Sequence, residues 1–141
     1  MPIFKKRDLK KKLEETNAKL AELNRELAEQ MILLASQTGD TSPLIDAIEA
    51  LRSAHAYYSL DSQPKETAEI QELIADTLSK IGRQNGDRGS LEYAVEAYRS
   101  AITLASMLNE DSMRKRLKKN YAVVKSALGD DLPFAPLFKV A

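Results

Sequence analysis

The sequence contains no cysteine, no tryptophan and a single histidine, His55. Without thiols the chain has no disulfides, thiolate metal ligands or cysteine nucleophile, and one histidine makes Ser-His-Asp catalysis a poor expectation. Only five glycines and five prolines occur among 141 residues, and this scarcity of helix breakers favours long helices. No apolar run approaches the ~20 residues of a membrane span, and no apolar segment of a signal peptide follows the basic start. We therefore expect an all-α, cytoplasmic protein that needs no cofactor.

Net charge is also absent, because 21 basic residues balance 21 acidic ones. No excess of positive charge marks the chain as a nucleic-acid binder, so we expect no nucleic-acid partner. The charges are nevertheless segregated: residues 1–20 hold seven basic and three acidic groups, residues 21–76 three and eleven, and residues 114–141 seven and two. This pattern fits either solvated helix faces of different sign or a charge-guided contact, within a dimer or with a partner.

An internal repeat organises the chain. Residues 37–54 (QTGDTSPLIDAIEALRSA) align without a gap on residues 84–101 (QNGDRGSLEYAVEAYRSA), with ten identities in eighteen positions at an offset of 47. Similarity at a fixed period indicates a repeated supersecondary unit. Both copies contain a Gly-Asp pair, and we interpret Asp40 and Asp87 as turn and capping residues.

Each copy has the pattern of a helical hairpin, because apolar residues recur at helical spacing on both sides of the Gly-Asp break. Alanines three or four positions apart, among them Ala47 and Ala94, form a low ridge that lets a neighbouring helix approach closely. We expect Leu27, Met31 and Leu34 to line the inner face of the first helix and Gly82 to help stop the third. The predicted helices, with no strand, lie near residues 5–38, 43–60, 64–83, 90–109 and 112–128. The basic residues of the last helix, Arg116 among them, suit the polar outer face of a terminal repeat.

Residues 91–102 (LEYAVEAYRSAI) resemble the second helix of a tetratricopeptide (TPR) repeat, with its Leu-x-x-Ala-x-x-x-Tyr-x-x-Ala-Ile pattern. Residues 86–94 (GDRGSLEYA) are similar to a long-loop TPR subtype, and residues 44–54 match with leucine at the aromatic position. The resemblance covers roughly residues 24–128. It implies a short α-solenoid of stacked antiparallel hairpins, and a non-enzymatic adaptor or scaffold that binds a peptide or helix of a protein partner.

In a TPR-like stack the first helix of each hairpin lines a concave groove. The resemblance therefore implies a shallow groove floor of small side chains with polar rims, which would suit a helix or an extended peptide. Its positions are Arg25, Ala28, Ile32, Ser36, Glu72, Ser79, Arg83, Lys119 and Ser126. One candidate occupant is the chain's own tail, because residues 132–138 contain two leucines and two phenylalanines.

Residues 1–21 extend the first helix beyond the repeat domain of residues 22–128, and residues 129–141 form a tail. From Leu9 to Leu34, apolar residues follow the 4-3 spacing of a coiled-coil seam. We predict a homodimer through this seam. Because Lys10–Lys12 would repel each other in a parallel pair, we expect either an antiparallel pair or docking of the basic arm on the acidic region of residues 21–76. The alternatives are packing back on the chain's own stack, a partner helix, or a membrane surface. The dimer candidates are Leu9, Leu13, Leu20 and Leu23.

Two other classes of function remain as alternatives. A metal-dependent enzyme would use carboxylates of the third helix, but no histidine accompanies them and we interpret them as a solvated face. A membrane-associated scaffold would use the basic N-terminus, although its apolar content is thin. His55 occupies the position of Ile102 in the other repeat, which indicates a packing residue. The carboxylates in question are Glu66, Glu69, Glu72 and Asp76.

Overall fold

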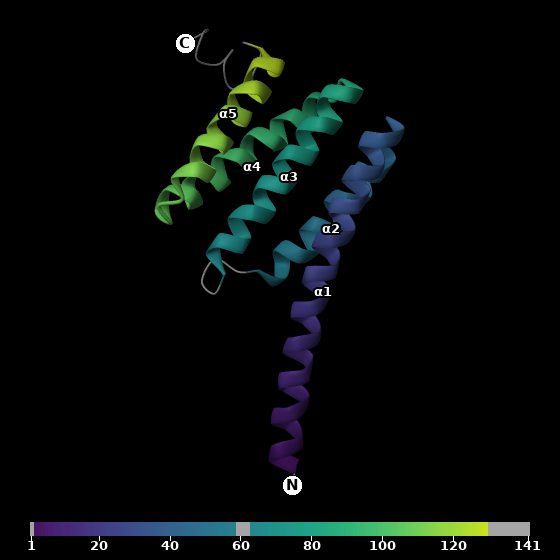
Figure 1. Cartoon of the computed structure of the whole chain (residues 1–141), viewed down its shortest axis with the longest axis vertical. Coiled ribbons are helices and arrows are strands. Elements are labelled where there is room, and N and C mark those ends of the chain that lie inside the picture. The colour runs from purple at the N-terminus through teal and green to yellow at the C-terminus, as the bar shows by residue number, and fades with distance from the viewer. Residues whose placement is uncertain (1, 59–62, 130–141) are drawn as a thin grey trace.

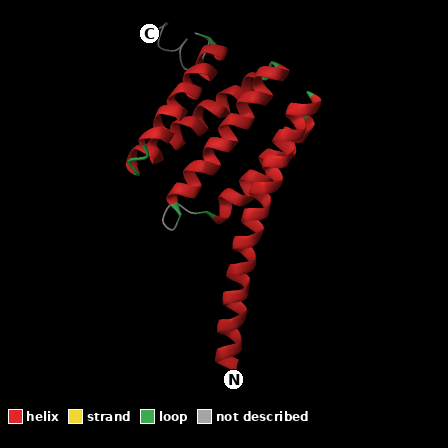
Figure 2. Ribbon diagram, viewed as in Figure 1, coloured by secondary structure: helices red, strands yellow, loops and turns green. Residues whose placement is uncertain are grey.

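The computed structural model describes residues 2–58 and 63–129, and within these ranges the chain is all-α, without a strand (Figure 2). Every predicted helix is present, and each predicted end lies within three residues of the observed one. The fold class is therefore confirmed. The helices are α1 (Pro2–Thr38), α2 (Ser42–Tyr57), α3 (Pro64–Asn85), α4 (Arg88–Met107) and α5 (Asp111–Leu128).

Consecutive helices pack on one another as antiparallel hairpins. α1 pairs with α2, α3 pairs with α4, α5 packs on α4, and α3 also contacts α5. As a result α1, α3 and α5 lie side by side in one layer, with α2 and α4 in a second layer behind them (Figure 1). The first helix of each hairpin thus contributes to a common face.

The two Gly-Asp turns have the predicted chemistry. The Asp40 carboxylate accepts the backbone N–H of Ser42 at 3.0 Å, and the Asp87 carboxylate accepts that of Gly89 at 3.1 Å. Gly86 follows α3 with φ +64°, a left-handed conformation that glycine adopts without a Cβ penalty. These bonds confirm Asp87 as the N-cap of α4 and Asp40 as a turn residue, whereas the N-cap position of α2 is Thr41.

Gly82 does not stop α3, contrary to expectation, because the helix continues to Asn85. Gly82 is buried where α3 crosses α4, and a Cβ at this position would lie 2.5 Å from Cγ of Leu91. The glycine therefore serves close helix packing rather than helix termination.

Alanines form the contacts between neighbouring helices. Ala47 and Ala94 are completely buried, as predicted. The inner face of α1 differs from expectation in part. Met31 is partly buried against the core, but Leu27 and Leu34 are about half exposed, and α1 instead buries alanines spaced seven residues apart against α2. A helix that packs through such small side chains comes close to its neighbour, and this leaves its leucine stripe on another side. The buried alanines are Ala21, Ala28 and Ala35.

The N-terminal half of α1 projects beyond the other helices (Figure 1). Residues 5–17 are all exposed, and Ala21 is the first buried residue of the helix. The arm is continuous with the rest of α1 and does not fold back onto the stack. None of the described helices combines the length and the apolar character needed to cross a membrane.

Candidate partner-binding groove

Two ion pairs join the first helices of successive hairpins. Arg25 of α1 reaches Glu69 of α3 with Nη2 2.7 Å from Oε2. Arg116 of α5 clasps Glu72 of α3 through both carboxylate oxygens, at 2.6 and 2.8 Å. Arg25 and Glu72 lie 47 positions apart in the sequence, and so do Glu69 and Arg116. The repeat therefore reproduces the same contact at both junctions, with its charges exchanged.

These contacts correct two expectations. The α3 carboxylates are not a solvated face, because Glu69 and Glu72 are paired and Glu72 is only 9% exposed. Arg116 faces the stack rather than the outer surface, and its hydrogen bonds to Glu72 raise its pKa. Burial works to lower the pKa of Arg25, but the ion pair with Glu69 outweighs it and the pKa rises. Both arginines therefore remain charged.

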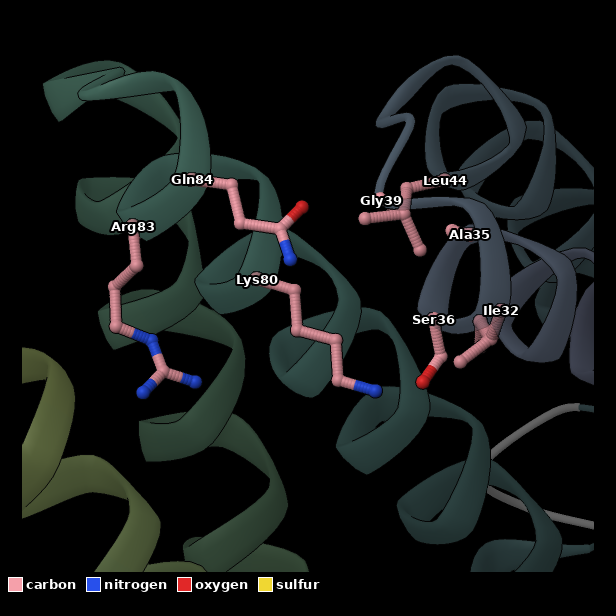
Figure 3. A pocket seen from close by; sticks show the side chains of 8 residues that line it. All are labelled: Ile32, Ala35, Ser36, Gly39, Leu44, Lys80, Arg83 and Gln84. Carbon is pink, nitrogen blue, oxygen red and sulfur yellow. The ribbon is translucent and has the colours of Figure 1, made fainter.

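A hollow of about 410 Å³ lies between α1 and the C-terminal half of α3. Lys80 reaches into it from α3 toward Ser36 on α1, Gln84 faces Gly39 and Leu44, and Arg83 points to the other side of α3 (Figure 3). The floor is apolar and the rim is polar. Its lining residues are Ile32, Ala35, Ser36, Gly39, Leu44, Lys80, Arg83 and Gln84.

A second hollow of about 310 Å³ lies on the α5 side of the same helix. It shares Lys80 and Arg83 with the first hollow, so the two adjoin along the C-terminal half of α3. Together they form a groove that runs across the common face from α1 to α5. The lining of the second hollow is Asp76, Ser79, Lys80, Arg83, Tyr98, Asn120 and Val123.

Lys80 and Arg83 form no ion pair among the described residues. Arg83 donates a hydrogen bond from Nε to the carbonyl oxygen of Ser79, at 3.4 Å. Asp76 lines the same hollow and accepts a hydrogen bond from the Tyr98 hydroxyl. Burial raises the pKa of Asp76, against the opposing effects of this bond and of the Lys80 charge, and burial together with Asp76 raises that of Tyr98. The groove therefore contains two cations without an ion pair, with one carboxylate nearby.

The opposite end of the common face has a different character. A third hollow of about 410 Å³ surrounds the two ion pairs near the start of α3. Lys65 and Glu110 add a longer pair there, at 3.7 Å. Positive and negative groups there are paired and largely neutralise one another, in contrast to the Lys80 end. The carboxylates of this hollow are Glu29, Glu69, Glu72 and Glu110.

The predicted groove residues divide into three groups. Ile32, Ser36, Ser79 and Arg83 line the two adjoining hollows, and Arg25 and Glu72 line the third. Ala28 is fully buried against α2 and does not reach the groove surface, because α1 packs through its alanines. Lys119 and Ser126 are exposed on α5 outside these hollows.

Sequence reasoning missed eight residues that line the groove: Gly39, Leu44, Asp76, Lys80, Gln84, Tyr98, Asn120 and Val123. Asn120 is the neighbour of the predicted Lys119, so the error on α5 is a shift of one position around the helix. Lys80 and Gln84 follow Asp76 at spacings of four, which places the three residues on one face of the helix. This spacing could have identified Lys80 and Gln84 from the sequence. The proposed tail occupant, residues 132–138, lies outside the described residues.

The other layer holds the histidine. His55 of α2 is half-buried, and its Nε2 lies 3.4 Å from Nε2 of Gln71 on α3. Arg52 and Glu96 lie nearby, around a hollow of about 300 Å³. No group of three or more histidine, aspartate or glutamate side chains gathers as a metal site in the part of the chain that the structure describes. The position of His55 between packed helices is consistent with a packing role.

The fold and the groove together define a class: a short stack of antiparallel helical hairpins whose first helices build one hollowed face. Comparison with protein-family models, with curated proteins and with solved structures found no match to this chain.

Proposed function

We propose that this chain is a TPR-like adaptor, a non-enzymatic module that binds a segment of a protein partner in the groove across α1, α3 and α5. The TPR-like pattern of residues 91–102 supports this reading, as does the stacking of hairpins that the pattern implies. The carboxylates that an enzyme would use are instead engaged: Glu69 and Glu72 bind arginines, and Asp76 binds Tyr98.

The observation that carries the proposal is the pair of adjoining hollows that share Lys80 and Arg83. The first hollow has an apolar floor, the second combines Val123 and Tyr98 with polar side chains, and the two cations between them form no ion pair among the described residues. A helix or extended peptide fits such a surface by placing apolar side chains in the hollows and an acidic side chain between them. We therefore expect an acidic segment with apolar residues on both sides of the acidic group.

A peptide selection tests this function. Random dodecapeptides displayed on phage are selected on the purified chain, and the consensus is made as a synthetic peptide. The account predicts an acidic residue flanked by apolar residues. Titrated into isotope-labelled protein, this peptide should shift the backbone amide signals of Ser36, Lys80, Gln84 and Asn120.

The other layer supplies the internal control. Tyr93 and Glu96 line the hollow between α2 and α4, far from the groove in the fold, and their amide signals should not move. A consensus that shifts these signals instead, or one that is basic throughout, would contradict the proposed groove.

A further inference from the structure

One side of α1 carries a stripe of leucines that no other helix of the described part of the chain covers. The positions follow the alternating 4-3 spacing of a heptad seam, from residue 9 to residue 34. Each leucine keeps between 47% and 66% of its surface exposed. The stripe spans 25 residue steps, about 38 Å at ~1.5 Å per residue. Its leucines are Leu9, Leu13, Leu20, Leu23, Leu27 and Leu34.

The chain's own stack does not explain this stripe. α1 packs on α2 through Ala21, Ala28 and Ala35, which occupy a different side of the helix. The arm of residues 5–17 has no neighbour at all among the described residues. Single exposed leucines are ordinary, but a stripe with six leucines at its eight seam positions marks an interaction surface.

We propose that the stripe pairs with the same stripe of a second copy of this chain, as an antiparallel coiled coil. In the register that uses the whole stripe, facing residues have numbers that add to 43, and the two-fold axis passes between Leu20 and Leu23. The interface is isologous, so every contact occurs twice. The facing layers are Leu9 with Leu34, Leu13 with Gln30, Thr16 with Leu27, and Leu20 with Leu23.

Charge complementarity selects this orientation. The positions that flank an antiparallel seam bring Lys19 of one copy beside Glu26 of the other, twice by symmetry. Residues 5–12, with six basic groups and one acidic group, then lie along residues 31–38 of the second copy, which carry no charge. A parallel pair would place the two basic stretches side by side, with Lys5 of one helix next to Lys10 of the other, and like charges repel.

The polar residues of the stripe are compatible with this pairing. Thr16 donates its hydroxyl hydrogen to the Lys12 carbonyl oxygen at 2.8 Å on its own helix, so it faces Leu27 without an unsatisfied donor. Gln30 is exposed near the other end of the seam and faces Leu13. Thr16 does not face Thr16 of the second copy, and Gln30 does not face Gln30, as they would in a parallel pair. In the resulting dimer the two helical stacks lie at opposite ends of a shared rod.

Cross-linking tests the orientation, since the chain has no natural cysteine to interfere. Leu9→Cys and Leu34→Cys are made as separate full-length variants and treated with a short bis-maleimide, alone and mixed. The antiparallel register predicts cross-linked dimers in the mixture only, because like positions lie about 38 Å apart along the rod. Efficient cross-linking of the Leu9→Cys variant alone would overturn the proposal in favour of a parallel pair.

Sedimentation equilibrium tests the assembly. Wild type should be dimeric at ~100 µM, a concentration well above the ~µM dissociation constants of ordinary weak complexes. Leu20→Asp with Leu23→Asp should be monomeric while its circular dichroism stays helical. A control with Ile45→Asp and Met107→Asp, two exposed apolar residues outside the stripe, should remain dimeric. A monomeric wild type would overturn the proposal and leave the stripe to a different partner.

Charge exchange tests the register. Lys19→Glu or Glu26→Lys alone should weaken the dimer about 10-fold at low salt, since each change turns two attractive pairs into repulsive ones. The double exchange should return the dissociation constant to within about threefold of wild type. Lys11→Glu, on the far side of the helix, is the matched control and should change little. A double variant no tighter than the singles would exclude this register.

Discussion

For Gly82→Ala, helix propensity predicts a gain in stability, whereas packing predicts a loss. In an open helix the change adds about 1 kcal/mol of stability, because glycine loses more backbone entropy than alanine on folding. At Gly82 the new Cβ would lie 2.5 and 2.6 Å from Cγ and Cδ2 of Leu91, and 3.0 Å from the Asp87 carbonyl oxygen. Cγ is not the free end of a side chain and the carbonyl is backbone, so α3 and α4 must separate locally.

Overpacking of this kind costs about 1–3 kcal/mol, which equals or exceeds the propensity gain. We therefore expect a net loss of up to about 2 kcal/mol, or a fall in Tm of up to about 7 °C for a chain of this size. Thermal denaturation followed by circular dichroism measures it at a fixed protein concentration. Leu91→Ala in the same chain should remove the clash, so that adding Gly82→Ala to it becomes neutral or stabilising.

Gly89→Ala is the matched control, since the new Cβ would meet only the Asp87 carboxylate, at 3.4 Å, and Gly89 lies within α4. This variant should keep or raise the Tm. If Gly82→Ala melts at or above the wild-type temperature, the close packing of α3 on α4 is not as described.

Three further predictions concern the stack. Ala94→Leu should lower stability by about 1–3 kcal/mol by overpacking a fully buried site, while Glu96→Gln on the exposed side of the same helix should change little. Glu72→Arg or Arg116→Glu alone should lower stability by about 1 kcal/mol, since Arg116 is half exposed. The double exchange should recover most of this stability, because Arg25 and Glu69 already form the same contact with the charges exchanged. Burial raises the pKa of Asp76, so the ionised carboxylate destabilises the fold at a pH above that raised pKa. Asp76→Asn should therefore raise the Tm at pH 7. The gain should disappear as the pH falls below the pKa of Asp76 in the unfolded chain, about 3.9.

The sequence predicted the helices well, because periodic apolar residues and two Gly-Asp turns place their ends. It predicted the buried alanines Ala47 and Ala94 for a related reason: the repeat shows which positions recur, and recurring small residues mark helix crossings. The homodimer and the binding role remain predictions.

The details that the sequence did not predict depend on which side of a helix meets its neighbour. For α1, two apolar stripes were available, one of leucine and one of alanine, and periodicity alone does not rank them. In the structure α1 packs through its alanines, so Ala28 is buried outside the groove, and Leu27 and Leu34 are exposed. The pairing of Glu72 with Arg116 required two helices 44 positions apart to be placed side by side, which only the three-dimensional stack provides.

Binding to the cations of the groove is the most direct test of the proposed function. The selected acidic peptide, labelled with a fluorophore, is titrated with wild type, with Lys80→Glu plus Arg83→Glu, and with Lys115→Glu plus Lys118→Glu on the exposed surface of α5. Fluorescence anisotropy at low salt should show at least a 10-fold loss of affinity for the groove variant, because each lost charged contact is worth about 1.5–3 kcal/mol. The α5 variant carries the same change in net charge and should bind within about threefold of wild type. Equal losses in the two variants would mean that general charge attraction holds the peptide, and would contradict a binding site between α1, α3 and α5.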